Sequence, residues 1–269
     1  MAILDGIIGC WSPSLGATGY RLLDRTKYGN HGTLTGMDAG TDWVASPIGL
    51  TLDFDGSNDY ISAPNVQAFA SGTQLTASIW VKRGATGTTH CLIGKWLSTA
   101  TSNEDGWLLR WNNANLINLS IANSGSYGIL SSSSAYTSTE WVHIAAVHEF
   151  GSSSKSVIYL NGSPIAATWT GGGTQVPDSD ATSAPITVGA LRYQGGPLQY
   201  LTGRLGEFAV FKRCLTATEL LRLYTSGSGW IGRELTGMNR RRRYGRAAGF
   251  KAAWAMRQRQ ILGGGGGLG

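Results

Sequence analysis

Charged residues are scarce in this 269-residue chain, because Asp, Glu, Lys and Arg together make up only 14% of it. A helical bundle needs many charged residues on its surfaces, and a disordered chain is rich in charge and poor in hydrophobic residues. Here hydrophobic residues account for 42% and glycine contributes 39 residues. This composition excludes both classes and favours a turn-rich all-β fold.

Cysteines and long apolar runs are scarce as well. The three cysteines, Cys10, Cys91 and Cys214, have apolar neighbours in the sequence, so we expect buried thiols rather than a disulfide framework. No apolar run approaches the roughly 20 residues that cross a bilayer, and the opening MAILDGIIGCW lacks the pattern of a secretory signal. We therefore expect no membrane span, no signal peptide and folding in a reducing cytoplasm.

The positive charge is concentrated at the C-terminus. Residues 1–232 hold 13 basic and 15 acidic residues, whereas residues 233–269 hold nine basic residues and one acidic residue. The net charge of +6 therefore belongs to the C-terminal segment and not to a basic face of the main domain. The flexible stretch SGSGW marks the boundary, which predicts a domain at 1–230 and a basic extension at 231–269.

The main domain is predicted to be a two-sheet jelly-roll sandwich. Short segments of β-forming residues recur between residues 50 and 212, separated by Gly, Ser, Asn and Thr. In LTASIWVK (75–82) the apolar residues alternate, so every second residue from Leu75 to Val81 should face the core. Many short strands at this spacing suit two stacked sheets better than a small barrel.

The segment LTATELLRLY (215–224) is the one helical prediction in this region. Thr216 is placed to cap the helix, and Glu219 stands three residues later, as in a capping box. Leu220 and Leu223 belong to its apolar stripe. The pattern predicts a short amphipathic helix that covers an edge of the sandwich.

Several sequence blocks occur in a characteristic order: WSP, LLDRTKYGNHGTL (22–34), LDFDGSNDYI (52–61), SIWVK (78–82), WVHIAAV (141–147), IYLNG (158–162) and GRLGEFAVFKRCLTATEL (203–220). Together they resemble a laminin-G-like module of the concanavalin A-like lectin/glucanase superfamily over about residues 7–224. The resemblance implies a jelly-roll fold and a lectin-like, carbohydrate-binding function.

The resemblance also implies a structural Ca²⁺ site at the rim of the sandwich, built from hard oxygen ligands. The matching positions are Asp24 and Asn30 in the block at 22–34, and Glu207 in GRLGE. The family commonly has Asp-Glu where this chain has Gly206-Glu207, so one expected ligand is missing. The alternative is a loop that hydrogen bonds hold without a metal.

Aromatic side chains are the candidates for carbohydrate binding, because flat rings stack on the apolar faces of sugars. Five aromatics lie at predicted strand ends or in loops: Trp96, Trp107, Trp111, Trp169 and Tyr193. Burial in the sandwich is the alternative for each of them.

Catalytic patterns are absent from the sequence. Glycoside hydrolysis needs two carboxylates about 5–9.5 Å apart. The glucanases of the superfamily carry theirs on an E-x-D-x-x-E strand, and this chain has no such segment. A nucleophile elbow, a phosphate loop and zinc-ligand spacing are also missing. We therefore expect no catalytic residues and no enzymatic activity.

The C-terminal extension combines a basic run with a predicted amphipathic helix. The basic run consists of Arg240, Arg241, Arg242 and Arg243. In GFKAAWAMRQRQIL, Phe250, Trp254 and Ile261 lie along one helix edge. So short a helix is not stable alone and predicts a partner surface, such as a neighbouring subunit, a nucleic acid or a membrane interface.

The start GIIGCWSPSLG and the end GFKAAWAMRQRQILGGG together resemble laminin-G-like proteins encoded among the structural genes of marine tailed phages. This resemblance implies a virion decoration or adhesion protein made in the host cytoplasm. Its extension would dock to other virion proteins or to copies of itself, and its jelly roll would bind cell-surface glycans. Two alternatives stay open: a free carbohydrate-binding module or carbohydrate-active enzyme, and a nucleic-acid-associated protein whose arginines neutralise phosphates.

Overall fold

The chain divides into two compact units, Met1–Gly232 and Arg233–Gly269. The computed structural model describes residues 3–64, 73–98, 104–124, 126–172, 184–193 and 196–237. The predicted anchoring residues of the extension, from Arg240 to Ile261, lie outside the described residues.

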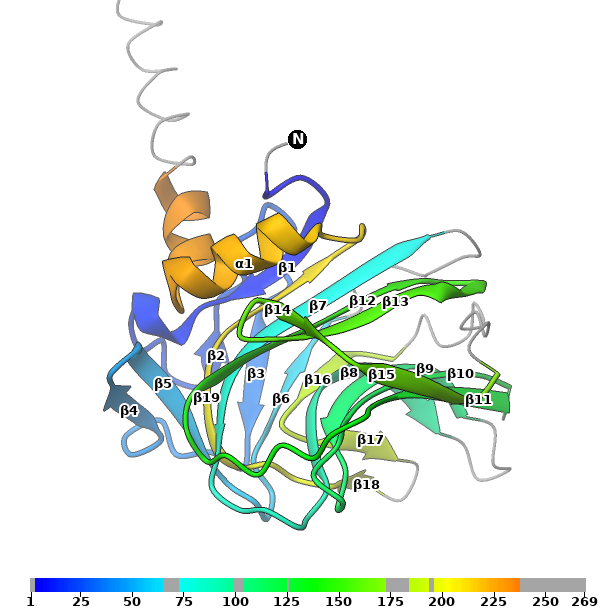
Figure 1. Cartoon of the computed structure of the whole chain (residues 1–269). Helices are drawn as coiled ribbons and strands as arrows, with labels where there is room; N and C mark the ends of the chain where they lie inside the picture. Colours follow the sequence, from blue (N-terminus) through cyan, green and yellow to red (C-terminus); the bar gives the residue numbers. More distant parts are fainter. Residues whose placement is uncertain are drawn as a thin grey trace, which may run out of the picture. The chain divides into compact units, whose positions relative to one another are not determined.

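Two large antiparallel sheets stack face to face in the first unit (Figure 1). The eight-stranded sheet runs in the order β14 (Ser163–Ile165), β13 (Ser152–Leu160), β12 (Val142–Glu149), β7 (Gln74–Arg83), β19 (Thr202–Phe211), β5 (Gly49–Asp55) and β4 (Trp43–Ser46), with β1 (Ile7–Trp11) paired to β19. The nine-stranded sheet runs in the order β15 (Ala167–Gly171), β11 (Ser126–Ser132), β10 (Ile117–Asn123), β9 (Glu104–Trp111), β8 (His90–Ser98), β16 (Ile186–Val188), β6 (Tyr60–Ala63), β3 (Gly32–Thr35) and β2 (Arg21–Leu22). This architecture confirms the predicted all-β jelly-roll sandwich.

The described part of the first unit also contains three short elements. They are the hairpin of β17 (Leu191–Tyr193) and β18 (Gly196–Leu198), the 3-10 turn η1 (Pro13–Leu15) and the helix α1 (Ala217–Ser226). A further helical segment begins at residue 230. Neither the hairpin nor η1 was expected from the sequence.

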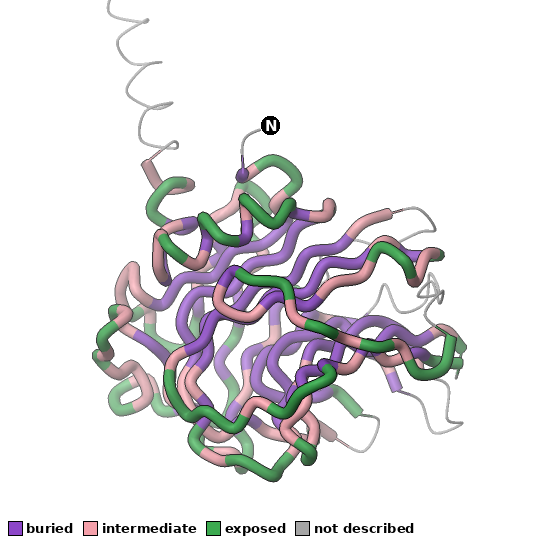
Figure 2. Tube along the Cα trace, viewed as in Figure 1, coloured by how far each residue is buried: buried purple, intermediate pink, exposed green. Residues whose placement is uncertain are grey.

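The core fills the space between the two sheets, as the buried inner strands in Figure 2 show. In β7 the alternate residues from Leu75 to Val81 are fully buried there, which confirms the predicted inward face. Alternation turns Ser78 and Trp80 to the outer face, but both are buried as well. They are buried because α1 covers this part of the sheet, where the Trp80 ring stacks on Tyr224 at 5.8 Å.

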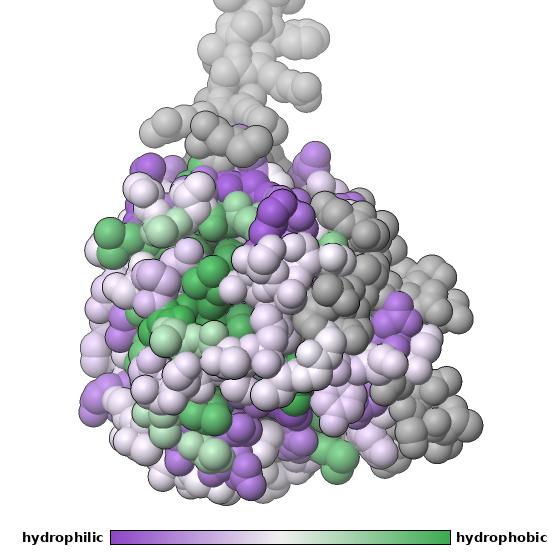
Figure 3. All heavy atoms as spheres, turned by 45° about the vertical axis from the view of Figure 1, so that its right-hand side comes forward, coloured by the Kyte–Doolittle hydropathy of each residue, from purple (hydrophilic) through white to green (hydrophobic). Residues whose placement is uncertain are grey.

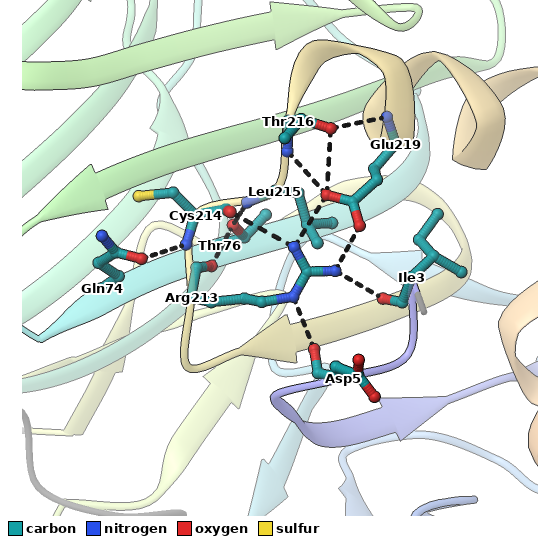
Figure 4. Close-up of polar contacts among 9 residues, drawn as sticks. All are labelled: Ile3, Asp5, Gln74, Thr76, Arg213, Cys214, Leu215, Thr216 and Glu219. Carbon is teal, nitrogen blue, oxygen red and sulfur yellow. Dashed lines mark hydrogen bonds and ion pairs between the residues drawn. The ribbon is translucent and has the colours of Figure 1, made fainter. Parts of the chain in front are cut away.

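The start of α1 is held by the network drawn in Figure 4. Thr216 and Glu219 form the predicted capping box. Arg213 donates to both carboxylate oxygens of Glu219, at 2.8 and 2.6 Å, and to the carbonyls of Ile3 and Asp5. The hydrogen bonds from Arg213 lower the pKa of Glu219 to about 2. The network therefore ties the N-terminal segment to the helix that closes the sheet.

The face in Figure 3 consists mainly of weakly polar residues, with a group of hydrophobic side chains among them. Three ion pairs form within the described parts of the chain, at Lys155–Glu149, Arg204–Asp53 and Arg213–Glu219. No helix in these parts has the length and apolarity that a membrane span requires.

Candidate functional site

Polar side chains line the outer face of the nine-stranded sheet where β9 and β10 pair. In β9 the alternate residues from Trp107 to Trp111 point into the core, so alternation turns Arg110 outward. Arg110 stands directly opposite Asn118 in the ladder. Residues paired in this way share a face of the sheet, and Ser120 follows Asn118 at the next outward position. Three polar groups of different chemistry thus lie side by side on a sheet surface.

Trp96 of β8 lies on the same outer face, opposite Gly106 of β9. Its ring packs in a small apolar cluster with Cys91, Leu108, Ala122 and Leu191. Because Leu191 belongs to β17, the hairpin is folded over this face rather than into the core. The hairpin therefore forms one border of the polar surface.

Four shielded polar atoms on this surface have no hydrogen-bond partner among the described residues: Trp96 Nε1, Arg110 Nε, Asn118 Oδ1 and Ser120 Oγ. We refer to these four residues as the outer-face cluster. Asn118 and Ser120 are only 3% and 2% exposed. Each unpaired buried group costs about 1–3 kcal/mol, so natural proteins keep few of them and seldom without a reason. These four lie on neighbouring strands of the outer face, whereas other unpaired atoms, such as Trp111 Nε1 and His143 Nδ1, belong to buried residues elsewhere.

The border of the cluster offers further contacts. Arg110 Nη1 donates to Gln199 Oε1 at 3.4 Å, which links β9 to the segment after the hairpin. Tyr193, at the tip of β17, is 43% exposed and is the one residue of the predicted aromatic set with an open ring. The surface thus combines donors, acceptors and an accessible aromatic ring.

The structure separates the five predicted aromatics into different environments. Trp107 and Trp111 are 0% and 1% exposed within the core between the sheets, which leaves no ring face for a sugar. Trp169 is half-buried and donates its indole N–H to the Ser153 carbonyl. Trp96 belongs to the outer-face cluster, and Tyr193 lies in the hairpin strand whose Leu191 packs against Trp96.

Sequence reasoning missed Arg110, Asn118 and Ser120. The signal was present, because each is a polar residue at an alternate position in a strand whose other positions are apolar. Their lack of partners could not be seen before the strands were placed in register.

Asp24, the first predicted calcium ligand, is held by hydrogen bonds. Its two carboxylate oxygens accept the backbone N–H groups of Cys10, Thr26 and Asn30 and the hydroxyl of Thr26, at 2.7–3.0 Å. The Asn30 carbonyl accepts the indole N–H of Trp11 at 2.8 Å. An oxygen that already faces N–H donors is a poor ligand for a cation, which must displace them.

Glu207, the other predicted ligand, is 4% exposed and points at the start of the helical segment after α1. Its carboxylate oxygens accept the backbone N–H groups of Ile231 and Gly232, at 3.1 and 2.8 Å. Cys10 lies between the two carboxylates, with its thiol 3.8 Å from Glu207. Burial, followed by the charges of Glu207 and Asp24, raises the pKa of this thiol well above its usual value.

The predicted calcium ligands therefore lie near one another but do not fit calcium. Their oxygens serve backbone donors, and no group of three acidic, His or Cys side chains in the described ranges could hold a metal ion. The hydrogen-bonded loop, which was the alternative, accounts for Asp24 and Asn30. A helix N-terminus, which attracts negative charge, accounts for Glu207.

Two Ser–His pairs lie in the eight-stranded sheet, and both of their histidines are buried. His143 Nε2 lies 2.8 Å from Ser78 Oγ, and His148 Nδ1 lies 2.7 Å from Ser156 Oγ. The second ring nitrogen of each histidine lacks a partner, so neither ring is oriented by an acid as in a hydrolase triad. Both histidines are enclosed by packed side chains, which gives them a structural role.

The chain matches one protein-family model. The laminin-G-like family model described as "Concanavalin A-like lectin/glucanases superfamily" matches residues 55–221, more than half of the chain. The chain belongs to this superfamily. A search of curated protein sequences gave no significant match.

Solved structures of binding domains share the fold. The binding domain of Paraclostridial mosquitocidal protein 1 aligns with a TM-score of 0.62 and 15% identity, over 84% of this chain and 53% of that one. A structure of botulinum neurotoxin type C, whose cell entry depends on interaction with two ganglioside molecules, aligns with a TM-score of 0.56 and 14% identity, over 83% and 52%.

A Trypanosoma rangeli sialidase aligns with a TM-score of 0.55 and 15% identity, over 82% of this chain and 32% of that one. This chain spans about half the length of the toxin structures and a third of the sialidase. At such identities the likeness shows the fold alone, which is a two-sheet jelly roll.

Proposed function

We propose that the protein is a non-catalytic glycan-binding module whose ligand lies on the outer face of the nine-stranded sheet. The observation that carries this proposal is the outer-face cluster, with its four shielded polar atoms that lack partners. Sugar hydroxyls both donate and accept hydrogen bonds, so an oligosaccharide of more than one ring can pair with the donors of Trp96 and Arg110 and with the acceptor of Asn118. Tyr193 supplies the stacking surface that sugar rings prefer.

The superfamily supports this proposal, as does the ganglioside interaction of botulinum neurotoxin type C. The number of acidic residues near the cluster favours glycan binding over glycan hydrolysis. On the described part of β8–β11, Glu104 is the one acidic residue that alternation places on the outer face, and hydrolysis needs two. Glu149 accepts hydrogen bonds from Lys155 and Gln74 in the other sheet, far from the cluster.

A screen of immobilised neutral oligosaccharides tests this proposal, with Ser120→Ala as the diagnostic variant. The wild type should bind at least one glycan, and Ser120→Ala should weaken binding about tenfold. The same variant should keep or slightly raise stability, because the hydroxyl it removes has no partner in the free protein. Ser133→Ala, at an exposed position, is the matched control and should change neither quantity.

A wild type that binds no glycan would contradict the proposal. So would a Ser120→Ala variant that is destabilised by 1–2 kcal/mol and still binds normally, because the hydroxyl would then serve the fold.

We further propose that the module is displayed on a virion and attached through its C-terminal extension. The charge distribution supports this, since the first unit carries −2 and residues 233–269 carry +8. A segment with two aromatics along one predicted helix edge complements an acidic partner surface with an apolar groove, as on a neighbouring subunit. Nucleic acid is the competing partner for the arginines.

Deleting residues 233–269 should leave a folded sandwich that no longer joins its assembly. Phe250→Ala combined with Trp254→Ala should reduce attachment more than neutralising Arg240–Arg243, because buried aromatic anchors usually dominate interface energy. Particle incorporation of the truncated and substituted chains measures this. Incorporation of the truncated chain at the wild-type level would show that the sandwich itself holds the contact.

A further inference from the structure

Three basic residues without acidic partners lie in one loop at an edge of the sandwich. Arg21, Arg25 and Lys27 belong to residues 20–31, which we call the rim loop; Arg21 lies in β2, the edge strand of the nine-stranded sheet. None of them takes part in the ion pairs found in the described ranges. The Nε of Arg25 is shielded and has no hydrogen-bond partner in the described part of the chain. The first unit is net negative, so this concentration of positive charge is local.

The single acid of the rim loop does not neutralise its outer surface. Asp24 is 5% exposed, and its oxygens face inward to four donors from the loop and from β1. Arg25 is half-buried. Arg21 and Lys27 are both exposed.

Two tyrosines flank these cations. Tyr20 is 61% exposed and Tyr28 is 50% exposed. The Lys27 ammonium lies 5.2 Å from the centre of the Tyr28 ring. Exposed aromatic rings beside unpaired cations are a combination that binds ligands with both anionic groups and apolar ring faces.

His31 adds a donor and reports the local potential. Burial, and then the neighbouring charges of Arg21 and Arg25, lower its pKa, although Asp24 opposes them. Its Nδ1 accepts the backbone N–H of Asp24 at 3.0 Å, so a neutral ring carries its proton on Nε2. The ring can therefore donate to an anion beside the two arginines.

We propose that the rim loop binds an acidic polysaccharide, with Arg21, Arg25 and Lys27 on its sulfate or carboxylate groups and the two tyrosines on its sugar rings. A polysaccharide strand is narrow enough to contact this loop alone. A broad anionic surface, such as a membrane or duplex DNA, would also meet the net negative remainder of the unit. The rim loop is a different surface from the outer-face cluster and does not depend on it.

Titration with oligosaccharides of κ-carrageenan and of agarose tests the proposal, because both are galactans and one is sulfated. The full chain should bind the sulfated oligosaccharide and not the neutral one at this loop. The double variant R21Q/K27Q should bind about tenfold more weakly. The association constant falls as the salt concentration rises, and in this variant the negative slope of log K against log salt should be shallower by roughly 2. The matched control K155Q/K212Q removes two exposed lysines elsewhere and should behave like the wild type.

NMR of the histidine rings gives a second readout. A bound anion should raise the pKa of His31, because it offsets the charges of Arg21 and Arg25. The proposal is overturned if R21Q/K27Q and K155Q/K212Q bind alike, if the pKa of His31 does not move, or if single-stranded DNA of equal charge binds more tightly. Glycan binding at the outer-face cluster would survive any of these results, because Ser120→Ala and neutral glycans test that surface separately.

Discussion

Lowering the pH from 6.5 to about 4 should remove about 3 kcal/mol of folding free energy for each of two buried histidines. Burial lowers the pKa of His143 from 6.5 to about 4, and it does the same for His148 against a small opposing effect of Glu149. Between pH 6.5 and pH 4 these two histidines bind protons in the unfolded chain but stay neutral in the folded chain. Stability is therefore complete above pH 6.5 and is lost as the pH falls toward 4.

Denaturant unfolding at a series of pH values measures this loss. We expect the free energy of unfolding to fall by up to about 1.4 kcal/mol per pH unit for each histidine. His143→Gln should remove about half of the total slope, whereas His31→Gln, at a half-exposed ring, should remove much less. Glu219, with a pKa of about 2, titrates below this window. Stability that stays constant from pH 7 to pH 4.5 would contradict the assignment.

Glu207→Ala should lower the free energy of unfolding by about 3 kcal/mol, because it leaves the buried N–H groups of Ile231 and Gly232 without an acceptor. Glu207→Gln keeps one acceptor oxygen and should cost clearly less. Glu140→Ala, at an exposed acid, should change stability by less than about 0.5 kcal/mol.

The same experiment separates a helix cap from a calcium ligand. An ion bound only by the folded state raises the melting temperature, so its removal lowers it. We expect EDTA to leave the melting temperature of the wild type unchanged. A decrease with EDTA that is absent in Glu207→Ala would show that this carboxylate holds a metal.

Patterns within single segments of the sequence predicted the core face of a strand and the start of a helix. The alternation in β7 fixed its core face, and Thr216 with Glu219 fixed the start of α1. The short strands β2, β17 and β18 were not predicted, because two or three residues carry too little periodicity. They form because neighbouring strands supply their hydrogen bonds.

The candidate site was harder to predict, since its chemistry depends on what long-range neighbours leave unpaired. A carboxylate at Glu207 suits a metal or a helix start equally well in the sequence, and its partners lie 24 and 25 residues away. Trp107 and Trp111 share a face with Leu109, so the alternation already favoured the core for them. Arg110 lies on the opposite, outer face of the same strand, together with the other residues of the outer-face cluster.

The most direct test of the glycan-binding account is the indole N–H spectrum of the protein during titration with a neutral oligosaccharide that it binds. The Trp96 indole has no partner in the free protein, whereas those of Trp11 and Trp169 donate to carbonyls at 2.8 and 3.0 Å. We predict a saturable shift of the Trp96 indole and the Arg110 Nε–H resonances, with Trp11 and Trp169 unmoved. Saturation of binding with the Trp96 and Arg110 resonances unchanged would place the glycan elsewhere and contradict the account.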